Sequence, residues 1–261
     1  MPHLRKREGS PLSTTDEERT QLLAEKFFPQ APTAVIASDT QPNRILTIPP
    51  QVTAEEVQGV INRLPKGKTP GPNGIPNEVL RAINQEISQP MAAAISRAFA
   101  YGALPASYKE SITLALRKGG KKDYSLLSSY RPIALENTLA KVVEKVLANR
   151  IAIAAEEHGL LPWNQMGARK DRSTLSAISL LTTCVESAWK AHPGCVVSML
   201  SLDIAGAFDN VPHAKLLWIL EKKGFPTWLV NTIASFLYER RTRIVYVGYK
   251  SDWIHTNTGI L

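Results

Sequence analysis

The sequence predicts an α+β fold that is rich in helices and contains a short antiparallel sheet. Apolar residues recur at helical spacing in several segments, and two short strand-like segments flank a basic loop that contains glycine. The 261 residues suffice for one large domain or two small ones, and 44% apolar with 21% charged residues is ordinary globular composition. A disordered tail, a collagen-like chain and a coiled coil are therefore disfavoured.

Capping residues and apolar spacing predict the helices. Thr53 and Glu56 form a capping box that opens a helix ending near Leu64. A cap at Asn137 and a proline at position 212 mark two further helix starts. Together with apolar periodicity, these signals predict helices over residues 15–28, 53–64, 77–87, 90–101, 137–154, 173–190, 212–223 and 228–238.

Three strand regions are expected. Residues 111–116 and 130–135 are predicted to pair as a basic antiparallel hairpin. Residues 195–204 are β-branched and almost continuously apolar, a pattern typical of a strand buried in the middle of a sheet. Residues 243–247 and 253–256 suggest a second hairpin.

The positive charge is unevenly distributed. Of the formal net charge of +8, +7 falls in residues 101–261. Two clusters of basic residues could face phosphates, because a polyanion that binds them releases its condensed counterions and this release favours binding. Alternatively, the two clusters are a solvated loop and a basic helix end. The clusters comprise Arg117, Lys118, Lys121 and Lys122, and Arg240, Arg241 and Arg243.

Several classes of protein are excluded by what the sequence lacks. Uncharged apolar runs are too short to span a membrane, and no apolar segment follows the basic amino terminus as in a secretory signal. An intracellular location, nuclear or cytoplasmic, is therefore expected. Cys184 and Cys195 are expected to be reduced core residues without a disulfide-linked partner, and the five histidines do not have zinc-ligand spacing.

Asp203 is the strongest candidate for chemistry. It follows the apolar run 195–204, and an ionised carboxylate is costly to bury unless it is paired or binds a metal. The small residues Ala205, Gly206 and Ala207 come next, and a carboxylate beside such a turn suits Mg²⁺ bridging to a triphosphate. A helix cap or a salt-bridge partner is the alternative for this aspartate.

Five segments occur in an order that resembles a known family. They are LLAEKFFP from Leu22, GKTPGPNGIPNEVL from Gly67, LRKGGKK with SYRPIALENTLAKVVEKVLANRI from Leu116, NQMGARKDRST from Asn164, and LSLDIAGAFDNVPH from Leu200. In this order the chain resembles the reverse transcriptases of LINE-type (non-LTR) retroelements, especially those found in fungi. The resemblance covers nearly the whole chain.

The resemblance implies a fingers-and-palm polymerase. Residues 1–50 would be a linker or N-terminal arm, residues 51–194 a fingers-like region with the basic hairpin at 111–135, and residues 195–261 a partial palm. The complete enzyme would transfer deoxynucleotides to a DNA primer on an RNA template, from dNTPs, with Mg²⁺ or alternatively Mn²⁺.

The resemblance also assigns roles near the aspartate. Asp203 would be the first palm metal ligand, and the Ile204 carbonyl would add a second oxygen. Gly206 and Ala207 would offer backbone amides to the incoming triphosphate. Phe208 matches the bulky residue that excludes a 2′-hydroxyl, with an ordinary core aromatic as the alternative.

Further roles fall on basic residues. Arg131 matches the fingers arginine that contacts the triphosphate, a role that suits the planar guanidinium. Lys118 and Lys121 would assist from the adjoining hairpin. Arg169 and Lys170 lie where the family contacts template, although an ordinary surface loop explains them equally well.

The chain departs from the family pattern at three points. Asn73 stands where aspartate is usual, and Gly119 where proline is usual, which puts the rigidity of two loops in doubt. No two of the seven aspartates are adjacent, so the Asp-Asp hairpin that completes a palm is not found before the final TNTGIL. Asp209 is expected to cap the helix that begins at Pro212.

Three functions remain open on this basis. The first is a fragment of a reverse transcriptase that is inactive alone, because it lacks the paired carboxylates. The second is a catalytically silent nucleic-acid-binding relic that uses the hairpin near Lys118 and the loop near Arg169. The third is an unrelated α/β protein whose Asp203 binds another ligand.

Overall fold

The computed structural model describes residues 3–29 and 44–260, and it confirms the predicted α+β class. The parts of the predicted arm at residues 1–2 and 30–43, together with residue 261, lie outside the described residues. The helices are α1 (Asp16–Phe27), α2 (Ala54–Asn62), α3 (Asn77–Ala82), α4 (Asn84–Tyr101), α5 (Thr138–Glu157), α6 (Thr174–Ala191), α7 (His213–Lys222) and α8 (Thr227–Leu237). The strands are β1 (Glu110–Arg117), β2 (Tyr130–Glu136), β3 (Arg241–Tyr246), β4 (Tyr249–Lys250) and β5 (Ile254–His255).

The sheet has the strand order β2-β1-β3-β4, with β5 also paired to β3. Strands β1 and β2 form the predicted antiparallel hairpin, in which Leu116 lies opposite Arg131. The sheet is mixed rather than purely antiparallel, because β3 runs parallel to β1. Parallel strands need a long crossover, so local hairpin patterns could not predict this pairing.

Helix α1 covers one face of this sheet. Leu23 and Phe27 from α1 are buried together with Leu4, and they pack against Tyr130 and Ile244. A capping box between Thr15 and Glu18 fixes the start of α1. Residues 3–29 therefore contribute to the core of the sheet, which their loose sequence pattern did not indicate. The proposed domain boundary at residue 50 stays a prediction.

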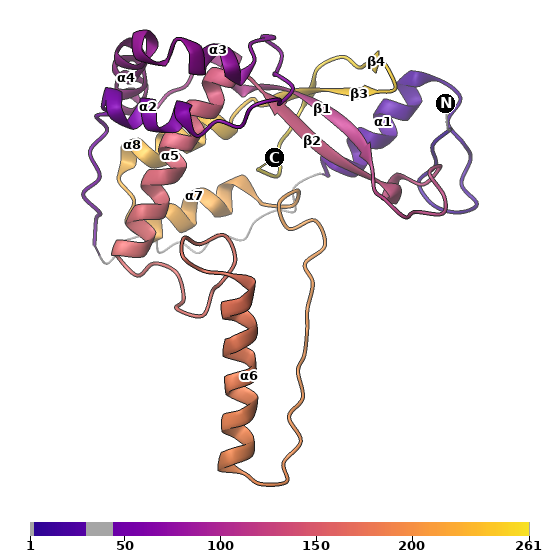
Figure 1. The fold of residues 1–261 in the computed structure, drawn as a ribbon. Coiled ribbons are helices and arrows are strands. Elements are labelled where there is room, and N and C mark those ends of the chain that lie inside the picture. Colours follow the sequence, from indigo (N-terminus) through magenta and orange to yellow (C-terminus); the bar gives the residue numbers. More distant parts are fainter. Residues whose placement is uncertain (1–2, 30–43, 261) are drawn as a thin grey trace. The chain divides into compact units, whose positions relative to one another are not determined.

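A second apolar cluster lies among the helices at the other end of the sheet (Figure 1). Val57 and Ile61 of α2 are fully buried, and α2 packs against α4. Phe99 of α4 stacks on Trp228 of α8, with ring centroids 5.1 Å apart. These contacts join helices that are far apart in the sequence, so the helical end of the unit depends on long-range packing.

The chain divides into two compact units. The first comprises residues 1–148 and 206–261, and the second comprises residues 149–205. Within the second unit, α6 has no buried residue. Cys184 lies on this helix and is exposed, so the predicted core location of Cys184 is wrong. Both cysteines are free thiols, and Cys195 is half-buried.

The predicted buried strand at residues 195–204 is also wrong. The structure assigns no strand there, and Val196 and Leu202 are 90% and 82% exposed. A strand needs hydrogen-bonding partners along its edges, and no strand in the described part of the chain pairs with this segment. The apolar pattern is therefore present without the neighbours that would bury it.

The proline-rich loop at residues 65–76 is fixed against the start of α5. A Cβ atom at Gly71 would lie 2.3 Å from the Glu136 carbonyl, so only glycine fits this close approach. Asn137 accepts a hydrogen bond from the Asn73 N–H at 2.9 Å, and Asn73 accepts one from the Ile75 N–H at 3.2 Å. An aspartate at position 73 would accept the same bond, so Asn73 does not weaken the loop in this respect.

We expect Asn137→Ala to lower the free energy of unfolding by about 1–3 kcal/mol, because it removes the buried acceptor for Asn73 and a donor to the Ser107 carbonyl. Asn73→Asp is the matched control and is expected to stay within about 0.5 kcal/mol of the parent chain. Urea denaturation followed by circular dichroism measures both. Equal midpoints for Asn137→Ala and the parent chain would contradict the anchoring role.

Candidate functional site

The predicted site residues are divided between the two units. The second unit contains Arg169, Lys170, Asp203 and Ile204. The first contains Lys118, Lys121, Arg131, Gly206, Ala207 and Phe208.

Asp203 lies in the exposed extended segment of the second unit. Its side chain is exposed, and Ile204 is 76% exposed. Among residues 3–29 and 44–260, no three histidine, cysteine or carboxylate side chains gather as a potential metal site. A protein site for a divalent ion draws on several oxygen ligands held together, so the described residues do not form a complete one.

The residues after Asp203 form a tight turn in the first unit. Gly206 has a left-handed backbone (φ +61°), and its carbonyl accepts hydrogen bonds from the backbone and the side chain of Asn210, at 3.0 and 2.9 Å. The Phe208 carbonyl accepts from the Ile260 N–H at 3.2 Å, and the Phe208 side chain is 65% exposed. Phe208 is therefore not a core aromatic, and its ring is accessible.

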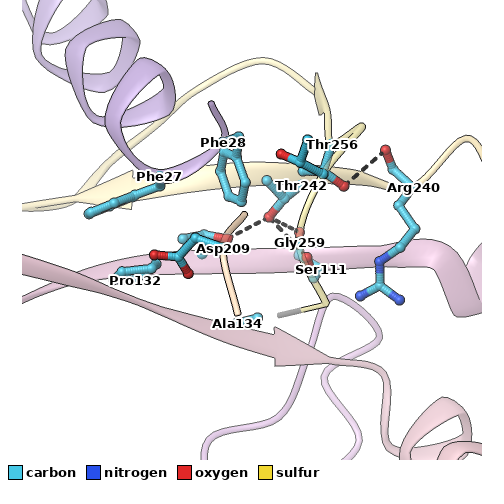
Figure 2. Close-up of a pocket in the computed structure, with 12 residues that line it drawn as sticks. Phe27, Phe28, Ser111, Pro132, Ala134, Asp209, Arg240, Thr242, Thr256 and Gly259 are labelled. Carbon is cyan, nitrogen blue, oxygen red and sulfur yellow. Dashed lines mark hydrogen bonds between the residues drawn. The ribbon is translucent and has the colours of Figure 1, made fainter. Parts of the chain in front are cut away.

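Asp209 does not cap α7, so that prediction is wrong. Pro212 occupies the cap position of this helix, and no side chain hydrogen-bonds there. Asp209 instead lines a small polar cavity together with Arg240 (Figure 2). A cap requires an aspartate at the position next to the helix, and Asp209 lies three residues before Pro212.

The cavity lies against the face of the sheet that α1 covers. It measures about 10 Å³, room for about one water molecule. Thr242 donates to the Ser111 carbonyl at 3.1 Å and accepts from the Ser111 hydroxyl at 2.9 Å, as Figure 2 shows. The remaining polar lining comes from Thr113, Thr256 and Thr258. This hydroxyl-rich cavity joins the loop at Asp209 to the sheet.

Arg240 is buried, whereas Arg241 and Arg243 of the same cluster are half-buried and Arg241 forms an ion pair with Glu110. The Arg240 guanidinium lies 2.7 Å from Glu136 and stacks over Phe236 at 4.0 Å. Burial, together with the neighbouring Glu136 carboxyl, raises the pKa of Glu144 well above its usual range. Arg240 therefore belongs to a buried charge network, and its sequence cluster with Arg241 and Arg243 does not form one surface.

The face of the sheet away from α1 carries three arginines. Opposite residues of paired strands point to the same side, which places Arg131, Arg241 and Arg243 on the face away from α1. Arg241 and Arg243 lie over the ring of Trp253, at 4.7 and 4.4 Å. We call Arg131, Arg241, Arg243 and Trp253 the open-face group. No sequence motif marks Trp253, because the arginines beside it, Arg241 and Arg243, belong to the earlier strand β3.

The two hairpin lysines have different surroundings. The Lys118 ammonium donates to the Ser128 carbonyl at 3.0 Å and so helps to close the hairpin loop. Lys121 is exposed at the tip. Lys121 is therefore the freer of the two to meet a ligand.

Arg169 is held by its own loop in the second unit. Its guanidinium donates twice to Glu156, at 2.8 and 2.6 Å, and once to the Pro162 carbonyl at 2.7 Å. The Glu156 carboxylate raises the pKa of Arg169, whose side chain is only 8% exposed. Lys170 is exposed. These bonds occupy most of the Arg169 donors and leave Lys170 as the accessible cation of the pair.

Two further observations bear on what this protein is. In the described part of the chain, no helix has the length and apolar character needed to cross a membrane. The profile described as reverse transcriptase (RNA-dependent DNA polymerase) matches residues 117–259. The chain belongs to the reverse transcriptase family. The match includes β2, α5 to α8 and the Asp203 segment, and it begins at the last residue of β1.

Similar proteins come from mobile elements of the non-LTR type. An RNA-directed DNA polymerase from the mobile element jockey of Drosophila melanogaster is 30% identical over 77% of this chain and 22% of its own length. A probable RNA-directed DNA polymerase from transposon BS, of the same fly, is 32% identical over 73% of this chain and 20% of its own. This reverse transcriptase chain thus spans about a fifth of these relatives.

The half-buried Glu144, whose Oε1 atom is buried, predicts a pH dependence. Its pKa is raised in the folded state, so its carboxyl lowers stability progressively as the pH rises from about 4.5 through the folded-state pKa. Glu144→Gln should remove this loss, and its melting temperature relative to the parent chain should rise with pH. Glu157→Gln, at an exposed position of the same helix, is the control. A constant difference between pH 4.5 and 8 for Glu144→Gln would refute the protonated state.

Proposed function

We propose that this chain supplies the fingers and the first part of the palm of an RNA-directed DNA polymerase encoded by a non-LTR retroelement. Its reaction is template-directed transfer of deoxynucleotides from dNTPs to a DNA primer on an RNA template. The observation that carries the proposal is the family match over residues 117–259, joined to a hairpin that exposes Arg131 on the arginine-bearing face away from α1. Phosphates of a nucleotide or a template are the ligands that suit this face.

The nucleotide side of the proposal rests on the hairpin. Arg131 is exposed on β2 and would pair with the triphosphate, because a guanidinium presents a planar fork of donors. Lys121 at the hairpin tip would assist by charge, and Lys118 would assist mainly by closing the loop. Lys170 and, less directly, Arg169 would contact template.

The turn at Gly206 would meet the incoming nucleotide. Gly206 and Ala207 are exposed, as backbone amides must be to bind phosphate oxygens. Phe208 is accessible and follows these amides directly, so its ring would limit the space beside the sugar. The fixed bonds of the Gly206 and Phe208 carbonyls would hold this turn in one geometry.

Reverse transcriptase domains generally use divalent metal ions, typically Mg²⁺. Asp203 and the Ile204 carbonyl are the oxygens we propose for this chain, with Mn²⁺ as an alternative ion. Further carboxylates would have to come from outside the described residues, because none of these completes the ligand set.

The exposed apolar segment 196–204 also fits a partial palm. An extended apolar run with unpaired backbone groups needs a neighbouring strand to be stable in water. We propose that the rest of the palm sheet supplies it. The fungal subclass of the element, the domain boundaries and an intracellular location, nuclear or cytoplasmic, remain predictions.

Asp203→Asn tests the proposed catalytic role. In a polypeptide that continues in frame through an Asp-Asp hairpin, we expect primer extension on an RNA template to fall at least about a hundredfold, since metal ligation contributes several kcal/mol. Asp252→Asn, at an exposed position on the β4–β5 connection, is the control. The 261-residue chain alone should not extend a primer. Wild-type rates in the Asp203 variant, or processive extension by the short chain, would overturn the assignment.

Phe208→Val tests the sugar selection in the same longer polypeptide. Shortening the side chain should open space for the 2′-hydroxyl, so ribonucleotide incorporation relative to deoxynucleotide incorporation should rise at least about tenfold. The ratio of kcat/KM values for the two nucleotides measures this effect. Phe236→Leu, which alters an aromatic in α8, controls for general loosening. An unchanged ratio would exclude the steric role.

A further inference from the structure

A basic groove lies between α2 and α5 in the first unit, and it shares no residue with the open-face group or with the Gly206 turn. Its volume is about 460 Å³, within the range of ligand-binding clefts. Arg63, Lys141 and Lys145 contribute three cations to its walls. The other lining residues are Val60, Leu64, Pro65, Glu144 and Ala148.

The charge of the groove is strongly positive. Glu144 is its one acidic lining residue, and its neighbour Glu136 together with burial disfavours the ionised form. In the described part of the chain, no ion pair involves Arg63, Lys141 or Lys145. Their charges are therefore not compensated locally, which is unfavourable unless an anion binds or solvent screens them.

The walls of the groove are held rigidly. Arg81 donates to the carbonyls of Asn62 and Leu64, the latter at 3.1 Å, and so fixes the end of α2. Asn77 donates to the Pro65 carbonyl at 2.8 Å. Asn137 accepts a hydrogen bond from the loop at residues 65–76 and so fixes the position of this loop beside the start of α5. A pre-organised cationic groove loses little conformational entropy when a ligand binds.

Two more cations extend the groove along the chain. Lys66 and Lys68 are exposed in the loop that follows Pro65. A row of cations that continues from a groove onto a loop suits a ligand with repeated negative charges rather than a single small anion. A single nucleic-acid strand has this pattern, one phosphate per nucleotide.

We propose that the α2–α5 groove binds the phosphodiester backbone of a single RNA strand, as a second contact separate from the proposed polymerase residues. Arg63, Lys141 and Lys145 contact phosphates inside the groove, and Lys66 and Lys68 contact those that follow. The choice of RNA rests on the proposed function, whereas the need for a polyanion rests on the charge and rigidity of the groove.

Binding of a short fluorescein-labelled single-stranded RNA tests this site. Fluorescence anisotropy against salt concentration gives the slope of log affinity on log salt. Lys141→Gln with Lys145→Gln should make that slope shallower by about 1.4, since each phosphate contact on a single strand contributes about 0.7. Lys222→Gln with Lys223→Gln, exposed at the end of α7, removes the same charge and should leave the slope unchanged.

Lysine acetylation of the unaltered chain gives a second readout that needs no variant. RNA should protect Lys141 and Lys145, but not Lys222 and Lys223, when modification is measured by mass spectrometry. Equal slopes for the two double variants, or equal acetylation of Lys141 and Lys145 with and without RNA, would contradict RNA binding in the groove. Neither result would affect the polymerase proposal. Loss of the Asp203 effect on primer extension, with the groove effects intact, would overturn the polymerase proposal alone.

Discussion

Strand β1 is hydrogen-bonded along both of its edges, and the first unit is organised around that double pairing. Strand β2 satisfies one edge in an antiparallel register, and β3 satisfies the other in a parallel register. Buried backbone groups must find partners, so a strand paired on both sides can be covered by α1 on one face. Residues 195–204 show the converse, because this apolar segment pairs with no strand among the described residues and is mostly exposed.

The same sheet places neighbouring arginines in different surroundings. Side chains alternate between faces along a strand, so adjacent arginines can meet different surroundings. Arg240 pairs with Glu136 in a buried network, whereas Arg241 and Arg243 lie against Trp253 on the face away from α1. Arg169 is different again, because an ion pair with Glu156 holds its guanidinium against its own loop. A cluster of positive residues in the sequence is therefore not equivalent to a basic surface.

Local signals predicted much of the fold. The N-cap at Thr53, the apolar spacing of α2, and the hairpin of β1 and β2 depend on residues close in sequence, so pattern alone identifies them. The reciprocal bond of the predicted capping box, from the Glu56 side chain, is not among the bonds at this cap. The parallel pairing of β1 with β3 and the burial of Leu4 depend on residues far away in the chain. For the same reason Trp253 and the Asp209 cavity could not be identified from motifs.

The sequence by itself determined the helices, the basic hairpin and, through the order of its motifs, membership of the reverse transcriptase family. These features depend on short-range spacing and on residue identity, both of which a linear pattern retains. Only the tertiary structure decided which cations are accessible and which are neutralised. That outcome depends on which distant carboxylate or carbonyl lies beside each guanidinium, as Glu136 beside Arg240 shows. It also depends on the groove between α2 and α5, where no ion pair among the described residues involves Lys141 or Lys145.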